Sequence, residues 1–238
     1  MDLQSIIDEG RRIVFFGGAG VSTESGIPDF RSADGLYSQK YKFPPEEIVS
    51  HQFFMDNTEE FYRFYRDRMI FPEAKPNAAH LKLAELERAG KLSAVITQNI
   101  DGLHTAAGSK RVIELHGSVH RNRCMKCGKS YGLDYIMSCD GVPRCECGGI
   151  VKPDVVLYGE SLNDSDISSA VKEISEADVL IIGGTSLAVY PAAGLIRFFN
   201  GSRVVVINKS AISADRTADL VINGSIGEEL GKIHVGLD

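Results

Sequence analysis

The sequence lacks long apolar runs, a surplus of positive charge and a secretion signal. No apolar stretch approaches the roughly 18 residues that a membrane-spanning helix needs. The segment Met1-Asp2-Leu3-Gln4 has neither a basic region nor an apolar signal core. The formal net charge of −6 argues against a general nucleic-acid binder. These absences predict a cytoplasmic protein with no direct nucleic-acid partner and no membrane partner.

Cysteine is scarce, and all five cysteines lie in the segment Arg121–Pro153. Four of them form two close pairs, each followed by glycine. Without an export signal, such pairs indicate metal binding rather than disulfides. Four thiolates leave no open coordination position, so the ion would be structural zinc rather than catalytic. The predicted ligands are Cys124, Cys127, Cys145 and Cys147.

The second cysteine pair is irregular, because Glu146 alone separates Cys145 from Cys147. Cys139 is therefore a rival ligand. The glycine turns beside both pairs favour the paired cysteines, since glycine allows the tight turns that aim two thiolates at one ion.

Short apolar runs alternate with helical patterns, which predicts a Rossmann-like, doubly wound parallel sheet of the α/β class. Helical patterns cover His80–Ala89 and Ser165–Glu176. The predicted strands are Ile13–Phe16, Ala94–Thr97, Val112–Leu115, Val179–Ile182, Val204–Ile207 and Leu220–Ile222.

Two stretches interrupt this alternation, one aromatic-rich and helical, the other carrying the cysteines. We predict that they are insertions that form a small domain, helical over approximately 37–75 and a zinc ribbon over approximately 119–153. The large domain would then comprise approximately 1–36, 76–118 and 154–238, so that residues 1–238 form a single core.

A glycine-rich turn, Gly18-Ala19-Gly20, follows the first predicted strand, and small and hydroxyl side chains follow where a helix is expected to start. A turn of this kind suits a pyrophosphate, because backbone N–H groups and the helix dipole both favour anions. The common dinucleotide fingerprint is incomplete here, since Thr23 occupies its third glycine position and no ribose-binding acid follows. Phe30 and Arg31 come next instead, which indicates a nucleotide used in an unusual way.

Polar side chains follow several predicted strands. Gln98-Asn99-Ile100-Asp101 comes after one strand and His116 after the next, and Gly184-Thr185-Ser186 and Asn208 follow two later strands. Each group alone is ordinary turn chemistry. Because the carboxyl ends of parallel strands share one edge, together they predict a ligand site with His116 as candidate general base.

Taken in order, these segments resemble the sirtuin family of NAD-dependent protein deacylases, and the resemblance runs to about Ile226. Further matching pieces are the Leu115-His116-Gly117 segment, Lys152–Glu160, and Tyr190-Pro191-Ala192-Ala193 beside Gly184–Leu187. The resemblance implies NAD as co-substrate, one structural zinc ion and acyl-lysine protein substrates bound as extended peptides. It also implies that the acyl group moves to ADP-ribose while nicotinamide leaves.

The resemblance implies roles for individual residues. His116 would be the general base, with Asn99 and Asp101 also catalytic. Substrate would lie along Val155, Val156, Leu157, Tyr158, Gly159 and Glu160, a segment that resembles the strand pairing with the peptide. The nucleotide would be held by Gly18, Ala19, Gly20, Thr23, Phe30, Arg31, Gln98, Asn99, Ile100, Asp101, His116, Gly184, Thr185, Ser186, Asn208 and Ile226.

One departure bears on the acyl chain. Family members that prefer succinyl or malonyl lysine carry Tyr-x-x-Arg, whereas this chain reads Tyr62-Arg63-Phe64-Tyr65. Without that arginine a carboxylate on the acyl chain lacks a bidentate partner. The sequence therefore predicts a preference for acetyl and short or apolar acyl groups.

Three alternatives remain open from the sequence. A hydride-transfer enzyme would use the glycine turn but gives no role to Phe30, Arg31 or the cysteines. A mono-ADP-ribosyltransferase or weak deacylase within the same family would use the same site, although the intact Asn99, Asp101 and His116 favour deacylation. A non-enzymatic binder of ADP-ribose or nucleic acid would use the zinc ribbon. The negative net charge of the chain argues against this third alternative.

Overall fold

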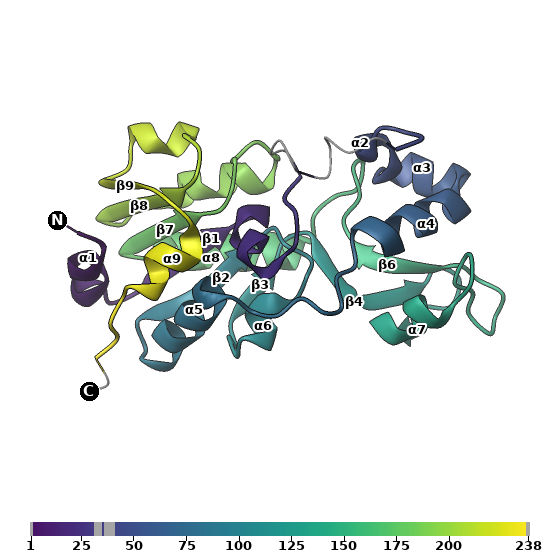
Figure 1. The fold of residues 1–238 in the computed structure, drawn as a ribbon, viewed down its shortest axis with the longest axis horizontal. Helices are drawn as coiled ribbons and strands as arrows, with labels where there is room; N and C mark the ends of the chain where they lie inside the picture. Colours follow the sequence, from purple (N-terminus) through teal and green to yellow (C-terminus); the bar gives the residue numbers. More distant parts are fainter. Residues whose placement is uncertain (1, 31–34, 36–40, 237–238) are drawn as a thin grey trace.

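The short apolar runs form one parallel six-stranded sheet, as the sequence predicts (Figure 1). The computed structural model describes residues 2–30, 35 and 41–236. The strand order is β3-β2-β1-β7-β8-β9, and every neighbouring pair is parallel. The strands are β1 (Ile13–Gly17), β2 (Leu92–Thr97), β3 (Val112–Glu114), β7 (Val179–Gly183), β8 (Arg203–Asn208) and β9 (Leu220–Asn223).

The strand ends differ slightly from the apolar runs. β8 and β9 each continue to an asparagine, Asn208 and Asn223, because ladder hydrogen bonds use the backbone and do not require an apolar side chain. β3 ends at Glu114, one residue before the predicted end, since Leu115 and His116 form the turn into the next strand.

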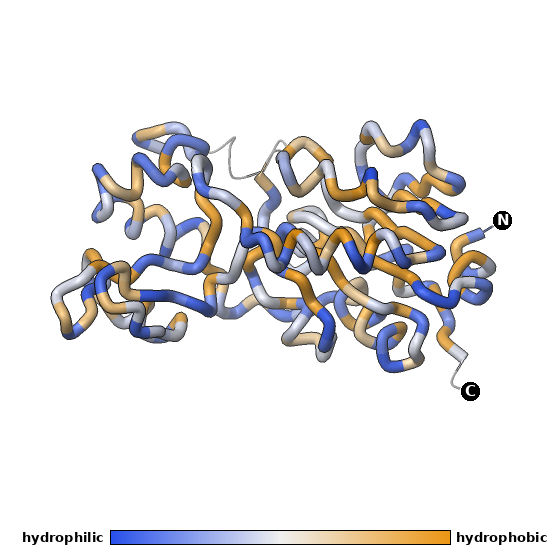
Figure 2. Tube along the Cα trace, turned by 180° about the vertical axis from the view of Figure 1, so that it is seen from behind, coloured by the Kyte–Doolittle hydropathy of each residue, from blue (hydrophilic) through white to orange (hydrophobic). Residues whose placement is uncertain are grey.

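Helices cover both faces of the sheet, which makes it doubly wound. Ile13 and Phe15 point into the core under α1 (Leu3–Glu9), α5 (Ala78–Arg88) and α9 (Ile226–Gly231). Val14 and Phe16 point into the opposite core, because side chains alternate along a strand. That core is covered by α8 (Asp164–Glu176), η4 (Ala192–Phe198) and η5 (Ser213–Arg216), and Figure 2 shows the hydrophobic strands between the two layers.

Asparagine caps explain where two of these helices begin. The Asn77 side chain accepts a hydrogen bond from the Ala79 N–H, so α5 starts two residues before the predicted His80. Asn163 accepts from Ser165 N–H and Asp166 N–H and starts α8 at Asp164. In the part of the chain that the structure describes, no helix has both the length and the apolar character that crossing a bilayer requires.

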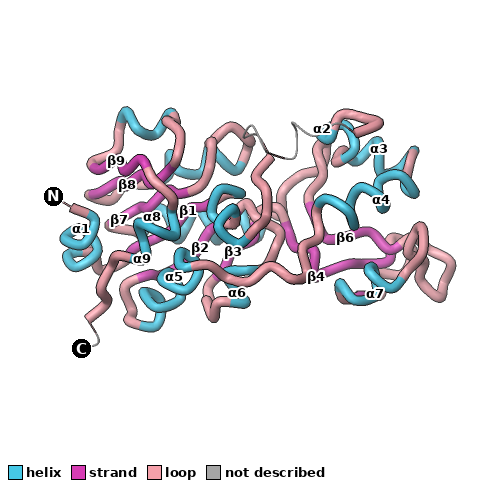
Figure 3. The backbone as a smooth tube through the Cα atoms, viewed as in Figure 1, coloured by secondary structure: helices cyan, strands magenta, loops and turns pink. Residues whose placement is uncertain are grey.

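A second body lies beside the sheet domain (Figures 1 and 3). An antiparallel sheet of order β5-β4-β6 packs with four helices around an aromatic core that includes Phe54, Phe61 and Tyr62. This grouping joins both interrupting stretches, although the predicted domain boundaries remain predictions. Its elements are α2 (Pro45–Ile48), α3 (His51–Asp56), α4 (Thr58–Arg68), β4 (Gly117–Cys124), β5 (Ser130–Tyr131), α7 (Leu133–Ser138) and β6 (Val151–Val155).

The register of the large sheet aligns the strand ends that carry the polar motifs. Gly17 of β1 lies opposite Thr97 of β2 on one side and Gly183 of β7 on the other. Gly183 in turn lies opposite Ile207 of β8. The chain reverses its direction of winding between β1 and β7, and ligands of α/β sheets bind at such a switch point.

Candidate functional site

A cleft of about 1100 Å³ lies at this edge, between the carboxyl ends of the strands and the second body. Its walls include every predicted nucleotide and substrate residue that the structure describes. Arg31, also predicted for the nucleotide, lies outside the described residues. The predicted residues on the walls are Gly18, Ala19, Gly20, Thr23, Phe30, Gln98, Asn99, Ile100, Asp101, His116, Val155, Val156, Leu157, Tyr158, Gly159, Glu160, Gly184, Thr185, Ser186, Asn208 and Ile226.

The two glycine turns pack directly against each other. Gly20 N–H donates to the Gly184 carbonyl at 2.8 Å, and a Cβ added to Gly20 would lie 2.8 Å from the Gly184 Cα. Gly184 itself has φ +58°, which disfavours other residues. Glycine is therefore required at both positions. Close contact requires it at Gly20, and both close contact and backbone conformation require it at Gly184.

The expected helix after the first glycine turn is absent from residues 19–25. Two short 3₁₀ turns occupy this stretch, η1 (Ala19–Val21) and η2 (Thr23–Ser25). Gly26 ends the second turn in the left-handed region at φ +83°, and Pro28 follows after Ile27. Both features stop a helix from continuing, so the prediction of a helix N-terminus was wrong.

A buried hydroxyl connects the two predicted catalytic amide and acid groups. Ser22 Oγ donates to Asp101 Oδ2 at 2.6 Å and accepts from Asn99 Nδ2 at 3.0 Å. Asp101 Oδ1 accepts from the Leu103 N–H at 2.9 Å, which fixes the carboxylate from its other side. Ser22 was not among the predicted site residues, although it stands beside Thr23 in the same glycine-rich segment.

Polar groups from three strands meet at the other end of the cleft. Gln98 Nε2 donates to Thr185 Oγ1 at 3.0 Å, and Asn208 Nδ2 donates to the Thr185 carbonyl at 3.2 Å. These bonds join the loops after β2, β7 and β8. Their donors and acceptors have the chemistry that ribose hydroxyls and an adenine ring would need.

His116 lies in the turn between β3 and β4 and is held by a backbone carbonyl. Its Nδ1 lies 2.9 Å from the Gln98 carbonyl oxygen, which can only accept, so Nδ1 carries the proton and Nε2 is the basic nitrogen. Burial lowers the pKa of His116, against the opposing effect of that hydrogen bond. The imidazole is thus neutral near pH 7 and able to accept a proton.

The predicted substrate segment is a strand only at its first residue. β6 ends at Val155, and beyond it Tyr158 forms one isolated parallel bridge to Ser50. The Glu160 carboxylate explains the bend, since it accepts from the Leu157 N–H at 2.9 Å and from Lys152 Nζ at 3.0 Å. The expectation of a continuous strand over this segment is therefore corrected to a bent loop.

The two tyrosines that bear on acyl preference lie in the core of the second body. Tyr62 and Tyr65 are fully buried, and neither contributes to the walls of the cleft. The Tyr62 hydroxyl donates to the Val151 carbonyl. Burial raises the pKa of both phenols. Phe30 is half-buried, packs against this same core and lines the cleft.

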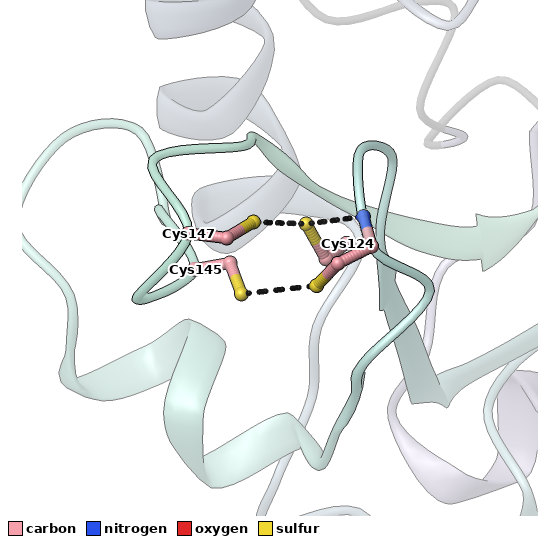
Figure 4. A group of neighbouring side chains, drawn as sticks. Cys124, Cys145 and Cys147 are labelled. Carbon is pink, nitrogen blue, oxygen red and sulfur yellow. Dashed lines mark hydrogen bonds between the residues drawn. The ribbon is translucent and has the colours of Figure 1, made fainter.

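The four paired cysteines converge as the sequence predicts (Figure 4). Their sulfur atoms all lie within 4.8 Å of one another, with 3.5 Å between Cys124 Sγ and Cys147 Sγ and between Cys127 Sγ and Cys145 Sγ. Zinc–sulfur bonds of about 2.3 Å in a tetrahedron place sulfurs about 3.8 Å apart, so the arrangement fits a Zn²⁺ ion. Among the described residues, Cys139 is not part of this group, because it ends α7 instead.

A buried pair of histidines behind Asp101 is a feature that the sequence did not reveal. The rings of His80 and His104 lie 4.6 Å apart, and both side chains are buried. Burial lowers the pKa of His80 to about 4, although the Asp101 charge raises it, and burial together with His80 lowers that of His104 to about 3. Both rings are therefore neutral near pH 7.

Comparison with known proteins gives one family. A model described as the Sir2 family matches residues 18–191. An NAD-dependent protein deacetylase of Clostridium acetobutylicum is 62% identical over 233 residues, which cover 96% of this chain and 95% of that protein.

Two solved structures match nearly the whole fold. A Sir2 protein solved with deacetylated p53 peptide and 3'-O-acetyl ADP ribose has a TM-score of 0.87 and 41% identity, covering 95% of this chain and 94% of the other. A Sir2 homologue in complex with NAD has a TM-score of 0.88 and 39% identity, covering 98% and 92%.

Proposed function

Because this chain belongs to the Sir2 family, we propose that it is an NAD-dependent protein lysine deacetylase. One observation carries the proposal: a single cleft joins the glycine turn, the Asn99–Ser22–Asp101 network and a neutral His116. When bound, NAD supplies an activated ribose with nicotinamide as its leaving group. The products would be nicotinamide, free lysine and O-acetyl-ADP-ribose.

The nucleotide half of the cleft would be formed by the large sheet. Gly18, Ala19 and Gly20 would receive the pyrophosphate, because glycine lets a ligand approach the backbone closely. Thr185 and Asn208 would hold the adenosine end, where the Asn208 side chain already donates to the Thr185 backbone carbonyl. Arg31 is proposed for the phosphates on the sequence resemblance alone.

The reaction centre would be formed by residues that orient groups rather than attack them. Asn99 and Asp101 would orient nicotinamide and its ribose, and Ser22 holds both side chains in place. Phe30 would exclude water from the reacting ribose. Holding the acyl oxygen beside the anomeric carbon supplies much of the rate through orientation.

His116 would accept a proton from a ribose hydroxyl at Nε2. The Gln98 carbonyl fixes the tautomer, and the lowered pKa keeps the ring unprotonated near pH 7. The substrate peptide would lie along residues 155–160, where backbone pairing would give affinity without strict sequence preference. We also propose a preference for acetyl and short or apolar acyl groups over succinyl groups.

The partners and the compartment stay predictions. We propose acyl-lysine proteins as substrates, a cytoplasmic location and no direct nucleic-acid or membrane partner. The acidic net charge of −6 supports the absence of a nucleic-acid partner.

The decisive test is incubation with NAD and an acetyl-lysine peptide, followed by mass spectrometry. We expect nicotinamide and O-acetyl-ADP-ribose in equal amounts. His116→Ala should lower turnover by roughly 10²–10⁴-fold, as expected for loss of a general base. Nicotinamide release without O-acetyl-ADP-ribose would contradict deacetylation, and full activity of the variant would contradict the role of His116.

A further inference from the structure

One carboxamide outside the cleft joins helix α5 to the segment that follows the glycine turn. Asn77 Nδ2 donates to the Val21 carbonyl at 2.8 Å and to Ser25 Oγ at 3.0 Å. Its Oδ1 accepts from the Ala79 N–H at 3.0 Å and caps α5. The side-chain oxygen of Asn77 thus caps the helix, while its side-chain nitrogen binds the segment after the glycine turn.

The segment Val21–Gly26 depends on such contacts because its own structure is weak. It contains parts of two single 3₁₀ turns, which have poorer hydrogen-bond geometry than an α-helix. A second contact comes from α9, where Glu24 Oε2 accepts from the Gly227 N–H at 2.7 Å. Two helices that pack on the same face of the sheet therefore hold the segment from two sides.

The residues between these contacts lie at the site. Ser22 and Thr23 line the cleft, and Ser22 connects Asn99 with Asp101. Asn77 itself is not among the described residues that line the cleft. Any effect of Asn77 on the nucleotide must therefore pass through the backbone at Val21 and the hydroxyl of Ser25.

We propose that Asn77 is a positioning residue for NAD, which holds Val21–Gly26 in its binding geometry before the nucleotide arrives. The inference rests on the proposed function, since it concerns the same nucleotide site. A segment ordered in advance binds more tightly, because the cost of ordering it is not subtracted from the binding free energy.

Asn77→Asp separates the two roles of the side chain. A carboxylate still accepts from the Ala79 N–H, and aspartate caps helices as well as asparagine does. It can no longer donate to the Val21 carbonyl or to Ser25, and it repels that carbonyl. Asn163→Asp is the matched control, because it makes the same change at the cap of α8. The hydrogen bonds that Asn163 Oδ1 accepts come from Ser165 and Asp166, within the same helix start.

The first measurement is the Kd for ADP-ribose by calorimetry, which needs no catalysis. We expect about tenfold weaker binding for Asn77→Asp, because the bond to the Val21 carbonyl is lost and a carboxylate is left facing that oxygen. Binding by Asn163→Asp should stay within about twofold of wild type. Melting temperatures of the two variants should agree. Hydrogen exchange at residues 21–26 of the free protein should accelerate only in Asn77→Asp.

The second measurement is steady-state kinetics. In Asn77→Asp the KM for NAD should rise about tenfold while kcat at saturating NAD stays within about threefold, since the lost interaction is a binding interaction. Ser25→Ala removes one of the two acceptors without touching the cap of α5. It should give a smaller weakening of ADP-ribose binding in the same direction.

Equal ADP-ribose affinity of Asn77→Asp and wild type would overturn the inference, as would equal weakening in Asn163→Asp. If Asn77→Asp does not fold, unchanged binding by Ser25→Ala overturns it and weakened binding supports it. If the wild-type chain binds ADP-ribose but releases no nicotinamide, the proposed function fails, and the affinity ratio still decides the role of Asn77. A wild-type chain that does not bind ADP-ribose overturns both.

Discussion

His104 shows how one buried residue makes the stability of the protein depend on pH. Neither ring nitrogen has a hydrogen-bond partner among the described residues, and the pKa is lowered to about 3. In the unfolded chain the pKa of histidine is about 6.5, so the unfolded state binds more protons between these values. The free energy of unfolding must therefore fall as the pH drops below about 6.5.

We expect His104→Phe to reduce this acid sensitivity. At pH 5 the penalty from one such histidine is about 2 kcal/mol, at 1.36 kcal/mol for each pH unit below 6.5. The variant should therefore lose about 2 kcal/mol less stability than wild type between pH 7.5 and pH 5, measured by urea unfolding. His234→Phe is the control, because His234 is exposed. Equal pH dependence in wild type and His104→Phe would contradict the explanation.

The zinc ribbon shows how an element depends on a few contacts. β5 has only two residues and α7 has six, which is too little structure to be stable alone. Cys145 and Cys147 reach the other pair because Gly148, at φ +81°, turns the chain immediately after them. A metal ion would then supply the stability that apolar burial cannot.

We expect purified protein to contain about one zinc ion per chain, as a four-thiolate site requires. Cys145→Ser should lose the metal and unfold the second body, seen as lost zinc by elemental analysis and a lower melting temperature. Cys139→Ser is the matched control and should keep the metal. Zinc lost from Cys139→Ser but retained in Cys145→Ser would show that Cys139 is the ligand.

At the scale of the whole molecule, the cleft lies where the sheet domain meets the second body. The two bodies lie side by side in Figure 3. The large sheet provides the polar wall, with Gln98, Asp101 and Asn208. The second body provides apolar wall residues such as Val119 and Leu133. An acyl chain held against the second body would therefore meet a largely apolar surface.

We expect faster turnover of acetyl-lysine than of succinyl-lysine peptides. A buried carboxylate needs a paired cation, and without one its transfer costs several kcal/mol. The measurement is kcat/KM on two peptides that differ only in the acyl group, and we expect a ratio of at least about tenfold. Faster succinyl removal would contradict the prediction and would point to a cation elsewhere in the cleft. Arg68 lines the cleft and would be the first residue to substitute in that case.

Local sequence signals account for much of the fold and of the site. Apolar runs predicted the strands, because a strand that is buried on both faces of a parallel sheet needs apolar side chains on both sides. Glycine turns and polar strand ends gave the cleft residues, since parallel strands end at one edge. The cysteine spacing indicated which four thiols converge, because two close pairs with glycine turns can aim four thiolates at one point.

The closed tertiary structure decided the rest. The bonds from Ser22 to Asp101 and from Asn77 to Val21 join residues 79 and 56 positions apart. The tautomer of His116 depends on a carbonyl 18 positions away. No local pattern encodes such pairs, because each depends on where separate elements come to lie once the whole chain has packed. The sequence by itself thus determined which chemical groups reach the cleft, and the tertiary structure decided how they are held.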